Sequence, residues 1–567
     1  MPFWLLLLPI ALSLQAQTTE DEGFEPVREH ARSVVSTRYG IVASSHTLAS
    51  AAGVKILEAG GNAIDAAIAT NAVMGLVEPT GNGIGGDLFA IVYEAKTGKL
   101  HGLNASGWAP TGLTPEFLKT KNESKMPERG IWSVTVPGAV AGWDALHGRF
   151  GRMKWAELFA PAIFYSEEGF PVTEIIGQSW SFERGLKILR MHANSEKVYM
   201  PSGKTPQPGD WFRNPDLARS LRAIAADGRA AFYKGAIAKS ILDISRELGG
   251  TFTAEDLAQF EPEWVAPIST SYRGWTVSEL PPNGQGIAAL TMLNIMEQFP
   301  LGEWGHNSPR ALHTMIEAKK LAYADMLKHV GDPRFSKIPV AELVSKEFAR
   351  ERAKLIGEKA ACKVVPAQLT SVAGLPGADT IYLSVVDREG NMVSLIQSNY
   401  LGFGSGVVPA ATGFMLQNRG ALFTLEADQP NTLAPRKRPL HTIIPGFLQK
   451  DDTRIAFGIM GGWNQAQAHA QFVANTVDFG MNVQQALESA RFTKVTFEGC
   501  AVSLESRIPE SVRTELSAKG HEVIVARPYA QRVGGGQAVM RNGRGINFGG
   551  SDPRKDGAAL PESPRFR

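Results

Sequence analysis

Two hydroxyl side chains, Thr380 and Ser398, stand at the far ends of two strand-like segments joined by a short turn. The segments 380–386 and 392–398 flank Asp387-Arg-Glu-Gly-Asn391, in which three residues with glycine last separate Asp387 from Asn391. That spacing is typical of a three-residue β-hairpin loop. With 387 opposite 391, Thr380 lies directly opposite Ser398. The pair is interpreted either as a nucleophile with a supporting hydroxyl or as an ordinary cross-strand contact.

Backbone N–H groups form a second candidate set for acyl transfer. Residues 454–459 predict a strand and 465–477 predict a helix, with Met460-Gly-Gly-Trp-Asn464 between them. Two successive glycines before a helix can direct consecutive N–H groups at one point, as an oxyanion hole does. A plain tight turn is the alternative. A nucleophile, a supporting hydroxyl and oxyanion donors together suffice for acyl transfer.

Other chemistries lack their motifs. The eleven histidines form no His-x-His or His-Glu-x-x-His pattern, and no Cys-x-x-Cys is present, so no metal is expected. The segment 402–406 is one residue out of register for a serine nucleophile elbow. The glycine-rich segment 81–87 follows a helix and precedes a strand, the reverse of a dinucleotide-binding turn. We interpret it as a tight loop that another segment approaches closely.

Helix-capping residues, glycines and the spacing of apolar residues predict the elements that position these groups. Residues 46–59 predict a helix that ends at Gly60-Gly61, and Asn62 is a good N-cap for a second helix. An apolar stripe on that second helix consists of Ile64, Ile68, Ala72 and Leu76. Residues 364–378 form an uncharged connector containing Pro and Gly, and the tail from Ser551 is expected to be loosely ordered.

Composition narrows the class of protein. The chain has 567 residues, 44% of them apolar and 20% charged, so it can bury a large core and is not a disordered chain. A formal net charge of +2 gives no electrostatic footprint for nucleic acid. Cys362 and Cys500 could form one disulfide or remain two buried thiols.

The N-terminal segment 1–17 reads as a signal peptide. Its apolar run is too short to span a bilayer, and small residues follow it. An uncleaved anchor is the alternative, because the segment contains no Lys or Arg. No later segment is a long apolar run, so the chain is predicted to be secreted or periplasmic without stable membrane insertion.

Several segments together resemble the γ-glutamyltransferase (glutathione hydrolase) family of N-terminal nucleophile hydrolases. The matching motifs are Gly40–Ser44, Ile56–Ala67, the Thr380 segment, Lys437–Leu440, Met460–Gly462, Ala490–Phe492 and Ser551–Arg554. The resemblance implies an α+β fold, a four-layer αββα sandwich. It also implies self-cleavage between Asp379 and Thr380 into a large chain, 18–379, and a small chain, 380–567, which stay associated as one intertwined unit.

The resemblance also implies roles for individual residues. Thr380 is the implied nucleophile of both self-cleavage and turnover, and its own α-amine then serves as general base. Ser398 stands where the family usually has a second threonine, so a hydroxyl is retained. Gly461 and Gly462 match the oxyanion-hole pair. No cofactor is implied.

This chain departs from the family at the positions that bind a γ-glutamyl group. Ser106 replaces the arginine that holds the substrate carboxylate, and Leu422 replaces the aspartate that holds the ammonium. Further differences are Tyr400 for an asparagine, Arg419 for a glutamine, and His441-Thr442 for a serine pair. The segment 423–435 is too short for the lid loop of some members.

Three hypotheses remain from the sequence. The first is an amidase acting on glutathione-like γ-glutamyl amides. The second is an acylase or amidohydrolase of the same family acting on another small acyl amide, of glutaryl, cephalosporin or oxamate type, with Arg419 as the candidate anchor for an anionic acyl group. Alternatively, Arg419, His441 and Trp463 are structural, and glutamate still binds through an altered set of contacts. The third is an uncleaved, secreted binding protein.

Overall fold

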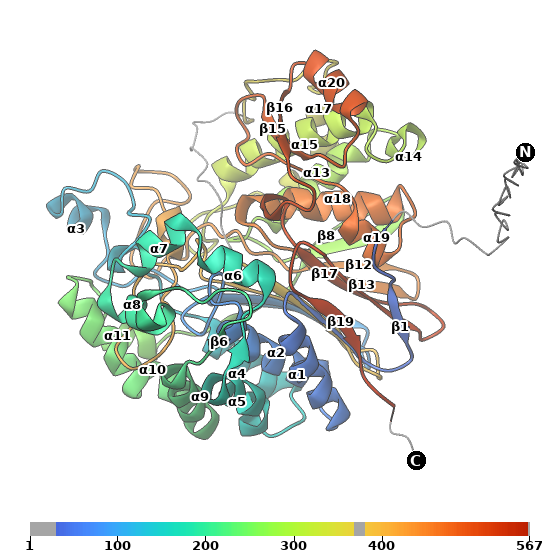
Figure 1. Ribbon diagram of the computed structural model, residues 1–567. Helices are drawn as coiled ribbons and strands as arrows, with labels where there is room; N and C mark the ends of the chain where they lie inside the picture. The colour runs from blue at the N-terminus through green and yellow to red at the C-terminus, as the bar shows by residue number, and fades with distance from the viewer. Residues whose placement is uncertain (1–29, 368–379, 565–567) are drawn as a thin grey trace, which may run out of the picture.

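Two seven-stranded antiparallel sheets lie face to face between two layers of helices (Figure 1). The computed structural model describes residues 30–367 and 380–564. In the first sheet the order is β19 (Ala558–Pro561), β2 (Ile41–Ser44), β10 (Ile381–Val386), β11 (Met392–Ser398), β3 (Asp87–Glu94), β4 (Lys99–Ala105) and β7 (Glu263–Val265). In the second it is β1 (Val35–Thr37), β18 (Asn547–Ser551), β17 (Gly536–Arg541), β13 (Thr453–Ile459), β12 (Gly446–Lys450), β9 (Trp275–Glu279) and β8 (Ile268–Tyr272). The predicted four-layer αββα sandwich is confirmed.

Helices close the outer face of each sheet. The first sheet is covered by α1 (Thr47–Glu58) and α2 (Ala63–Val77), with α4 (Ala139–Phe150), α5 (Ala160–Glu168) and α9 (Pro215–Asp227) around them. The second is covered by α13 (Gly286–Met296), α18 (Gln465–Val477) and α19 (Val483–Glu488), with α15 (Pro309–His329) and α17 (Lys346–Ala353) packed on α13. The inner faces of the two sheets therefore pack against each other.

The remaining elements decorate this sandwich. The helices are α3 (Pro115–Thr120), α6 (Glu174–Trp180), α7 (Glu183–Leu189), α8 (Ala193–Tyr199), α10 (Arg229–Tyr233), α11 (Ala236–Glu247), α12 (Ala254–Ala258), α14 (Leu301–Trp304), α16 (Val340–Leu343) and α20 (Glu510–Ala518). The small sheets pair β5 (Phe170–Pro171) with β6 (Trp211–Phe212), and β15 (Ala501–Glu505) with both β14 (Phe492–Thr493) and β16 (Glu522–Ala526).

Helix α2 begins as the sequence predicts, with Asn62 as its N-cap. The Asn62 side chain accepts from the N–H of Asp65, and the Asp65 carboxylate accepts from the N–H of Asn62, so α2 starts with a capping box. The prediction of a single apolar stripe on α2 is wrong. Fourteen of its fifteen residues are buried, because α1, α4 and α5 surround the helix on the sides that β10 and β11 leave uncovered.

The hairpin register is confirmed. In the β10–β11 ladder Ile381 pairs with Gln397 and Val386 with Met392, so the pairs follow the predicted register. Gly390 has a φ of +90°, the left-handed conformation that the three-residue loop requires of its last residue. Thr380 therefore lies directly before the pair that opens the ladder, opposite Ser398.

The hairpin is enclosed by segments that precede it in the chain. In the first sheet β10 pairs with β2, and β11 pairs with β3.

Cys362 and Cys500 form a disulfide, so of the two alternatives, one bridge or two free thiols, the bridge is present. Since residue 362 precedes the predicted cleavage site and residue 500 follows it, the disulfide joins the two predicted chains.

The expectation of a loose C-terminal tail is wrong for the part described. β19 adds to the edge of the first sheet beside β2. The guanidinium of Arg554 is buried and bonds the carboxylates of Glu505 and Asp552. The polar composition of this segment led to the prediction of disorder. Composition alone does not show which charged side chains are buried with a partner of opposite charge.

Other predictions concern residues beyond the described ranges. The signal segment 1–17, Asp379 and most of the connector 364–378 lie outside them. Within the described ranges no helix combines the length and apolarity needed to cross a membrane.

Candidate active site

The Thr380 and Ser398 side chains meet on the inner face of the first sheet. Their hydroxyl oxygens are 3.2 Å apart, and both residues are fully buried. Alternate residues along β10 and β11, such as Tyr382 and Ile396, belong to the apolar layer between the two sheets, and Thr380 and Ser398 continue that face. Ser398 Oγ also accepts the backbone N–H of Tyr400 at 2.8 Å. Ser398 can therefore donate its own proton to Thr380 Oγ1.

Asp87 extends this line of side chains onto a third strand. It is the first residue of β3 and pairs with Ser398, so the side chains of Thr380, Ser398 and Asp87 share one face on adjacent strands. The preceding glycines permit this approach. A Cβ on Gly86 would lie 2.6 Å from the carbonyl oxygen of Ser398, and one on Gly85 would lie 2.2 Å from that of Met415. The interpretation of 81–87 as a tight, closely approached loop is confirmed.

Asp87 is the centre of a buried polar cluster that sequence reasoning missed. Its carboxylate oxygen Oδ2 lies 2.6 Å from His441 Nε2 and 3.0 Å from Arg419 Nε, and Oδ1 lies 3.4 Å from Arg419 Nη2. Arg419 Nη1 donates to Thr442 Oγ1 at 2.7 Å. All four residues are 0% exposed. The sequence feature that could have indicated this cluster is an aspartate directly before the apolar run Leu88–Tyr93.

The charges in this cluster balance. Burial alone would raise the pKa of Asp87, but Arg419 and His441 hold it below its usual value, so the carboxyl is ionised. Burial, aided by Arg419, lowers the pKa of His441 to about 4, so the imidazole is neutral near pH 7. Its Nδ1 lies 3.4 Å from the N–H of Ile443, which fits a proton on Nε2 facing Asp87. One anion thus faces one cation.

The structure brings Tyr400 and Ser106 to the edges of the same cluster. The Arg419 guanidinium lies 4.7 Å from the centre of the Tyr400 ring. Ser106 Oγ donates to Asn104 and accepts from Asn283 at 3.2 Å, and the Asn283 carbonyl accepts the N–H of His441. Leu422 lies at the end of the short 3₁₀ turn that begins with Arg419.

Gly461 and Gly462 form a sharp turn between β13 and α18, with φ values of +121° and +58°. Among the residues that the structure describes, neither N–H donates to a protein acceptor. The turn is held from behind, because Gln285 Nε2 donates to the carbonyl of Gly462 at 2.7 Å and to that of Thr442. Two unused N–H groups on a fixed turn are the property an oxyanion hole needs.

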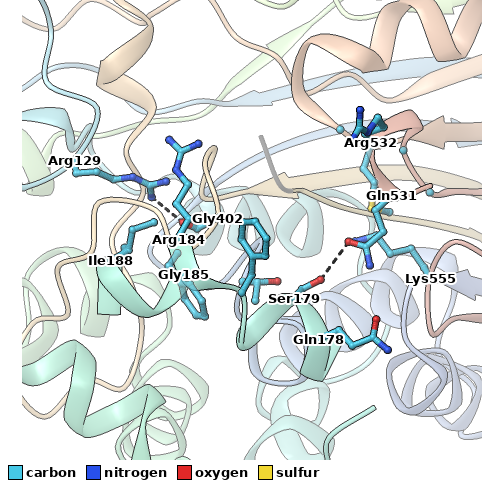
Figure 2. Close-up of a pocket in the computed structure, with 17 residues that line it drawn as sticks. Arg129, Gln178, Ser179, Arg184, Gly185, Ile188, Gly402, Gln531, Arg532 and Lys555 are labelled. Atoms are coloured by element: carbon cyan, nitrogen blue, oxygen red, sulfur yellow. Dashed lines mark hydrogen bonds between the residues drawn. The ribbon is translucent and has the colours of Figure 1, made fainter. Parts of the chain in front are cut away.

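Cavities lie on both sides of this turn. A cavity of about 520 Å³ includes Met460 and Gly461 and is walled by α6 and α7 on one side and by 531–535 on the other (Figure 2). Ser179 and Gln531 hydrogen-bond across it at 3.3 Å. A second cavity, of about 350 Å³, includes Leu422 and Trp463.

The two cavities differ in character. Basic side chains line the first cavity, namely Arg129, Arg184, Arg532 and Lys555, and none of its lining residues is acidic. The second is lined mainly by apolar side chains, including Leu327, Phe423, Leu440 and Phe497. Its Trp463 Nε1–H is buried and has no hydrogen-bond partner among the described residues.

One group of metal-ligating residue types lies together in the described part of the chain, His313, Glu317 and His521. The ring nitrogens of the two histidines are 2.8 Å apart and bond each other, and Lys320 already pairs with Glu317. Glu317 is therefore already paired with a cation, while His521 Nδ1 is buried and has no hydrogen-bond partner among the described residues.

Comparisons with known proteins agree with this geometry. The gamma-glutamyltranspeptidase family model matches residues 49–562. The glutathione hydrolase-like YwrD proenzyme of Bacillus subtilis is 38% identical over 536 residues, 93% of this chain and 99% of that protein. The oxamate amidohydrolase proenzyme of Klebsiella pneumoniae is 33% identical, over 93% of this chain and 98% of that protein.

A solved structure extends the likeness to the whole fold. The crystal structure of cephalosporin acylase from Bacillus halodurans is 42% identical and has a TM-score of 0.87, covering 95% of this chain and 99% of that one. With a family model that spans most of the chain, relatives that are proenzymes and a paired Thr380–Ser398 site, the chain belongs to the gamma-glutamyltranspeptidase family of N-terminal nucleophile hydrolases.

Proposed function

We propose that the chain cleaves itself between Asp379 and Thr380 and then uses Thr380 to cleave small acyl amides. The Thr380 Oγ1 attacks the amide carbonyl while the freed α-amine of the same residue takes the hydroxyl proton. The oxyanion forms against the N–H groups of Gly461 and Gly462. The α-amine returns the proton to the departing amine, and water releases the acyl group from the ester. Ser398 orients the attacking hydroxyl.

The observation that carries the choice of acyl group is the cavity at Leu422 and Trp463. It presents apolar side chains where the family resemblance places an ammonium-binding carboxylate, and the arginine expected at position 106 is a serine. Its two carboxylates do not substitute well, since Glu128 pairs with Arg184 and Glu426 is exposed. This supports an acylase that takes a short apolar acyl group, with an acceptor atom for the Trp463 N–H.

We assign the amine half of the substrate to the cavity on the other side of Gly461. An amide that straddles the turn would place its acyl group toward Leu422 and its amine toward α6 and α7. Phe182, 67% exposed, provides an apolar contact there. The amine released is therefore proposed to have an apolar body.

A matched series of 4-nitroanilides tests the acyl assignment. Butyryl, glutaryl and γ-glutamyl anilides share one four-carbon chain, to which a carboxylate and then an ammonium are added. Processed enzyme should hydrolyse the butyryl anilide with the highest kcat/KM and the γ-glutamyl anilide with the lowest. Preference for glutaryl over butyryl would instead support Arg419 as an anchor, which remains a prediction.

Glutathione hydrolysis is the second candidate, because several relatives are named glutathione hydrolase or glutathione hydrolase-like proenzymes. Under that function the γ-glutamyl anilide and glutathione would be the best substrates. Efficient turnover of both, with slow butyryl hydrolysis, would establish it and remove the acylase proposal.

We further propose export, with 1–17 removed as a signal peptide. The Cys362–Cys500 disulfide supports this, since structural disulfides persist mainly in oxidising compartments. The processed protein would consist of chains 18–379 and 380–567. N-terminal sequencing of both chains, recovered from the medium or periplasm, tests the two proposed cleavage sites, before residues 18 and 380.

A further inference from the structure

The side chains that the family resemblance assigns to the polar head of the acyl group point to one internal carboxylate. Arg419 and His441 bond Asp87 directly, and Thr442 is reached through Arg419. The Tyr400 ring lies against the same guanidinium. Neither Asp87 nor Arg419 lines the cavity at Leu422 or the basic cavity. The residues at these head-group positions therefore bond a carboxylate of the protein itself.

The contacts of Asp87 are those that a bound carboxylate would make. Three N–H donors, from two guanidinium nitrogens and one imidazole nitrogen, reach its two oxygens at 2.6–3.4 Å. Planar guanidinium donors match carboxylate geometry closely, and charge-assisted bonds of this kind are stronger than neutral ones. Asp87 is ionised, and its charge offsets that of Arg419 in a fully buried site.

Asp87 also lies close enough to the reacting group to affect acyl binding. Thr380 and Asp87 are separated only by β11, so their backbones are two strand spacings apart, about 10 Å. Their side chains and a short acyl chain can span that gap together. A carboxylate that approached Arg419 would be repelled by the ionised Asp87, which already bonds that guanidinium.

We propose that Asp87 is a specificity-determining residue, whose carboxylate occupies Arg419 and His441 in place of a substrate carboxylate and so confines the acyl group to the apolar cavity at Leu422 and Trp463. The proposal rests on the acylase function above. It predicts that a single change at Asp87 unmasks a carboxylate site.

The variant Asp87→Gly tests the kinetic consequence. In the processed Asp87→Gly enzyme, the ratio of kcat/KM for glutaryl over butyryl 4-nitroanilide should rise at least tenfold above that of the wild type. The double variant Asp87→Gly/Arg419→Met should lose that rise. Asp478→Gly, which removes another buried carboxylate paired with an arginine, Arg273, is the matched control and should leave the ratio unchanged.

A binding measurement covers the case in which the variant does not process or turn over. Asp87→Gly leaves a space the size of acetate beside Arg419, so millimolar acetate or formate should raise its Tm, whereas chloride at equal ionic strength and wild-type protein with acetate should show no rise. This readout is independent of hydrolysis, so it separates the role of Asp87 from failure of the acylase function. An unchanged kinetic ratio, or absence of anion stabilisation in Asp87→Gly, would overturn the proposal.

Discussion

Replacing Ser398 by alanine tests whether its hydroxyl serves the nucleophile. The change removes the 3.2 Å contact with Thr380 Oγ1 and the acceptor for the N–H of Tyr400. A neutral hydrogen bond contributes roughly 0.5–1.5 kcal/mol net. If the Thr380 contact is made fully in the transition state, its loss slows self-cleavage and turnover about two- to tenfold, since about 1.4 kcal/mol is a factor of ten.

The same substitution has a separate effect on stability. The N–H of Tyr400 would remain buried without its Ser398 acceptor, and leaving a buried donor unsatisfied costs about 1–3 kcal/mol. Comparing Ser398→Thr with Ser398→Val removes the ambiguity, because these two residues have nearly the same shape and differ in the hydroxyl. Both add volume at a fully buried site, so any packing defect is shared.

Two assays separate the effects. The rate of chain separation on a reducing denaturing gel measures self-cleavage, and butyryl 4-nitroanilide hydrolysis measures turnover. Ser398→Thr should retain both rates more fully than Ser398→Val and Ser398→Ala. If the valine and alanine variants processed and turned over as fast as the threonine variant, Ser398 would have no role beyond the sheet contact, and the interpretation of the pair as a nucleophile with a supporting hydroxyl would be wrong.

The remaining predictions concern cleavage, specificity and pH. A reducing gel of purified wild type should show two chains, and N-terminal sequencing of the smaller chain should give Thr-Ile-Tyr-Leu-Ser. Thr380→Ala should give only the full-length band. Two chains in that variant would exclude Thr380 as the nucleophile. Leu422→Asp should raise γ-glutamyl relative to butyryl kcat/KM about ten- to a hundredfold, because a charge-assisted bond contributes about 1.5–3 kcal/mol, and an equal gain in the neutral Leu422→Asn control would argue against charge recognition. Burial lowers the pKa of His46 and of His441 to about 4, so both rings stay neutral in the fold while the unfolded chain binds protons below pH ~6.5. Their stabilising contribution is complete above that pH and is lost as the pH falls toward 4, so Tm should decrease through this window, and a constant Tm would contradict the assignment.

Local sequence determined the part of the site that lies on one hairpin. Turn chemistry at Gly390 and a side-chain period of two were enough to place Thr380 opposite Ser398, because every contact involved lies within 19 consecutive residues. The sharp turn at Gly461 and the start of α2 at Asn62 followed from equally local signals. Such features need no knowledge of the rest of the chain.

The Asp87 cluster could not be found in that way. Asp87 meets Arg419 and His441 across sequence separations of 332 and 354 residues, and nothing near any of the three shows which charges pair. From the sequence alone, Arg419 could therefore be assigned to bind an anionic substrate group. The all-round burial of α2 had the same origin, since its extra neighbours come from distant helices.

The disulfide between Cys362 and Cys500 changes the molecularity of refolding. After the proposed cleavage before Thr380, β10 and β11 of the small chain would remain hydrogen-bonded between β2 and β3 of the large chain, so unfolding would release two separate polypeptides. Without a covalent link their reassembly would be second order, and recovery after denaturation would fall on dilution. With the disulfide intact the partners stay at an effective concentration set by the tether rather than by the solution. Recovery of the cleaved enzyme should then be independent of protein concentration under oxidising conditions and become concentration-dependent once a reductant is added.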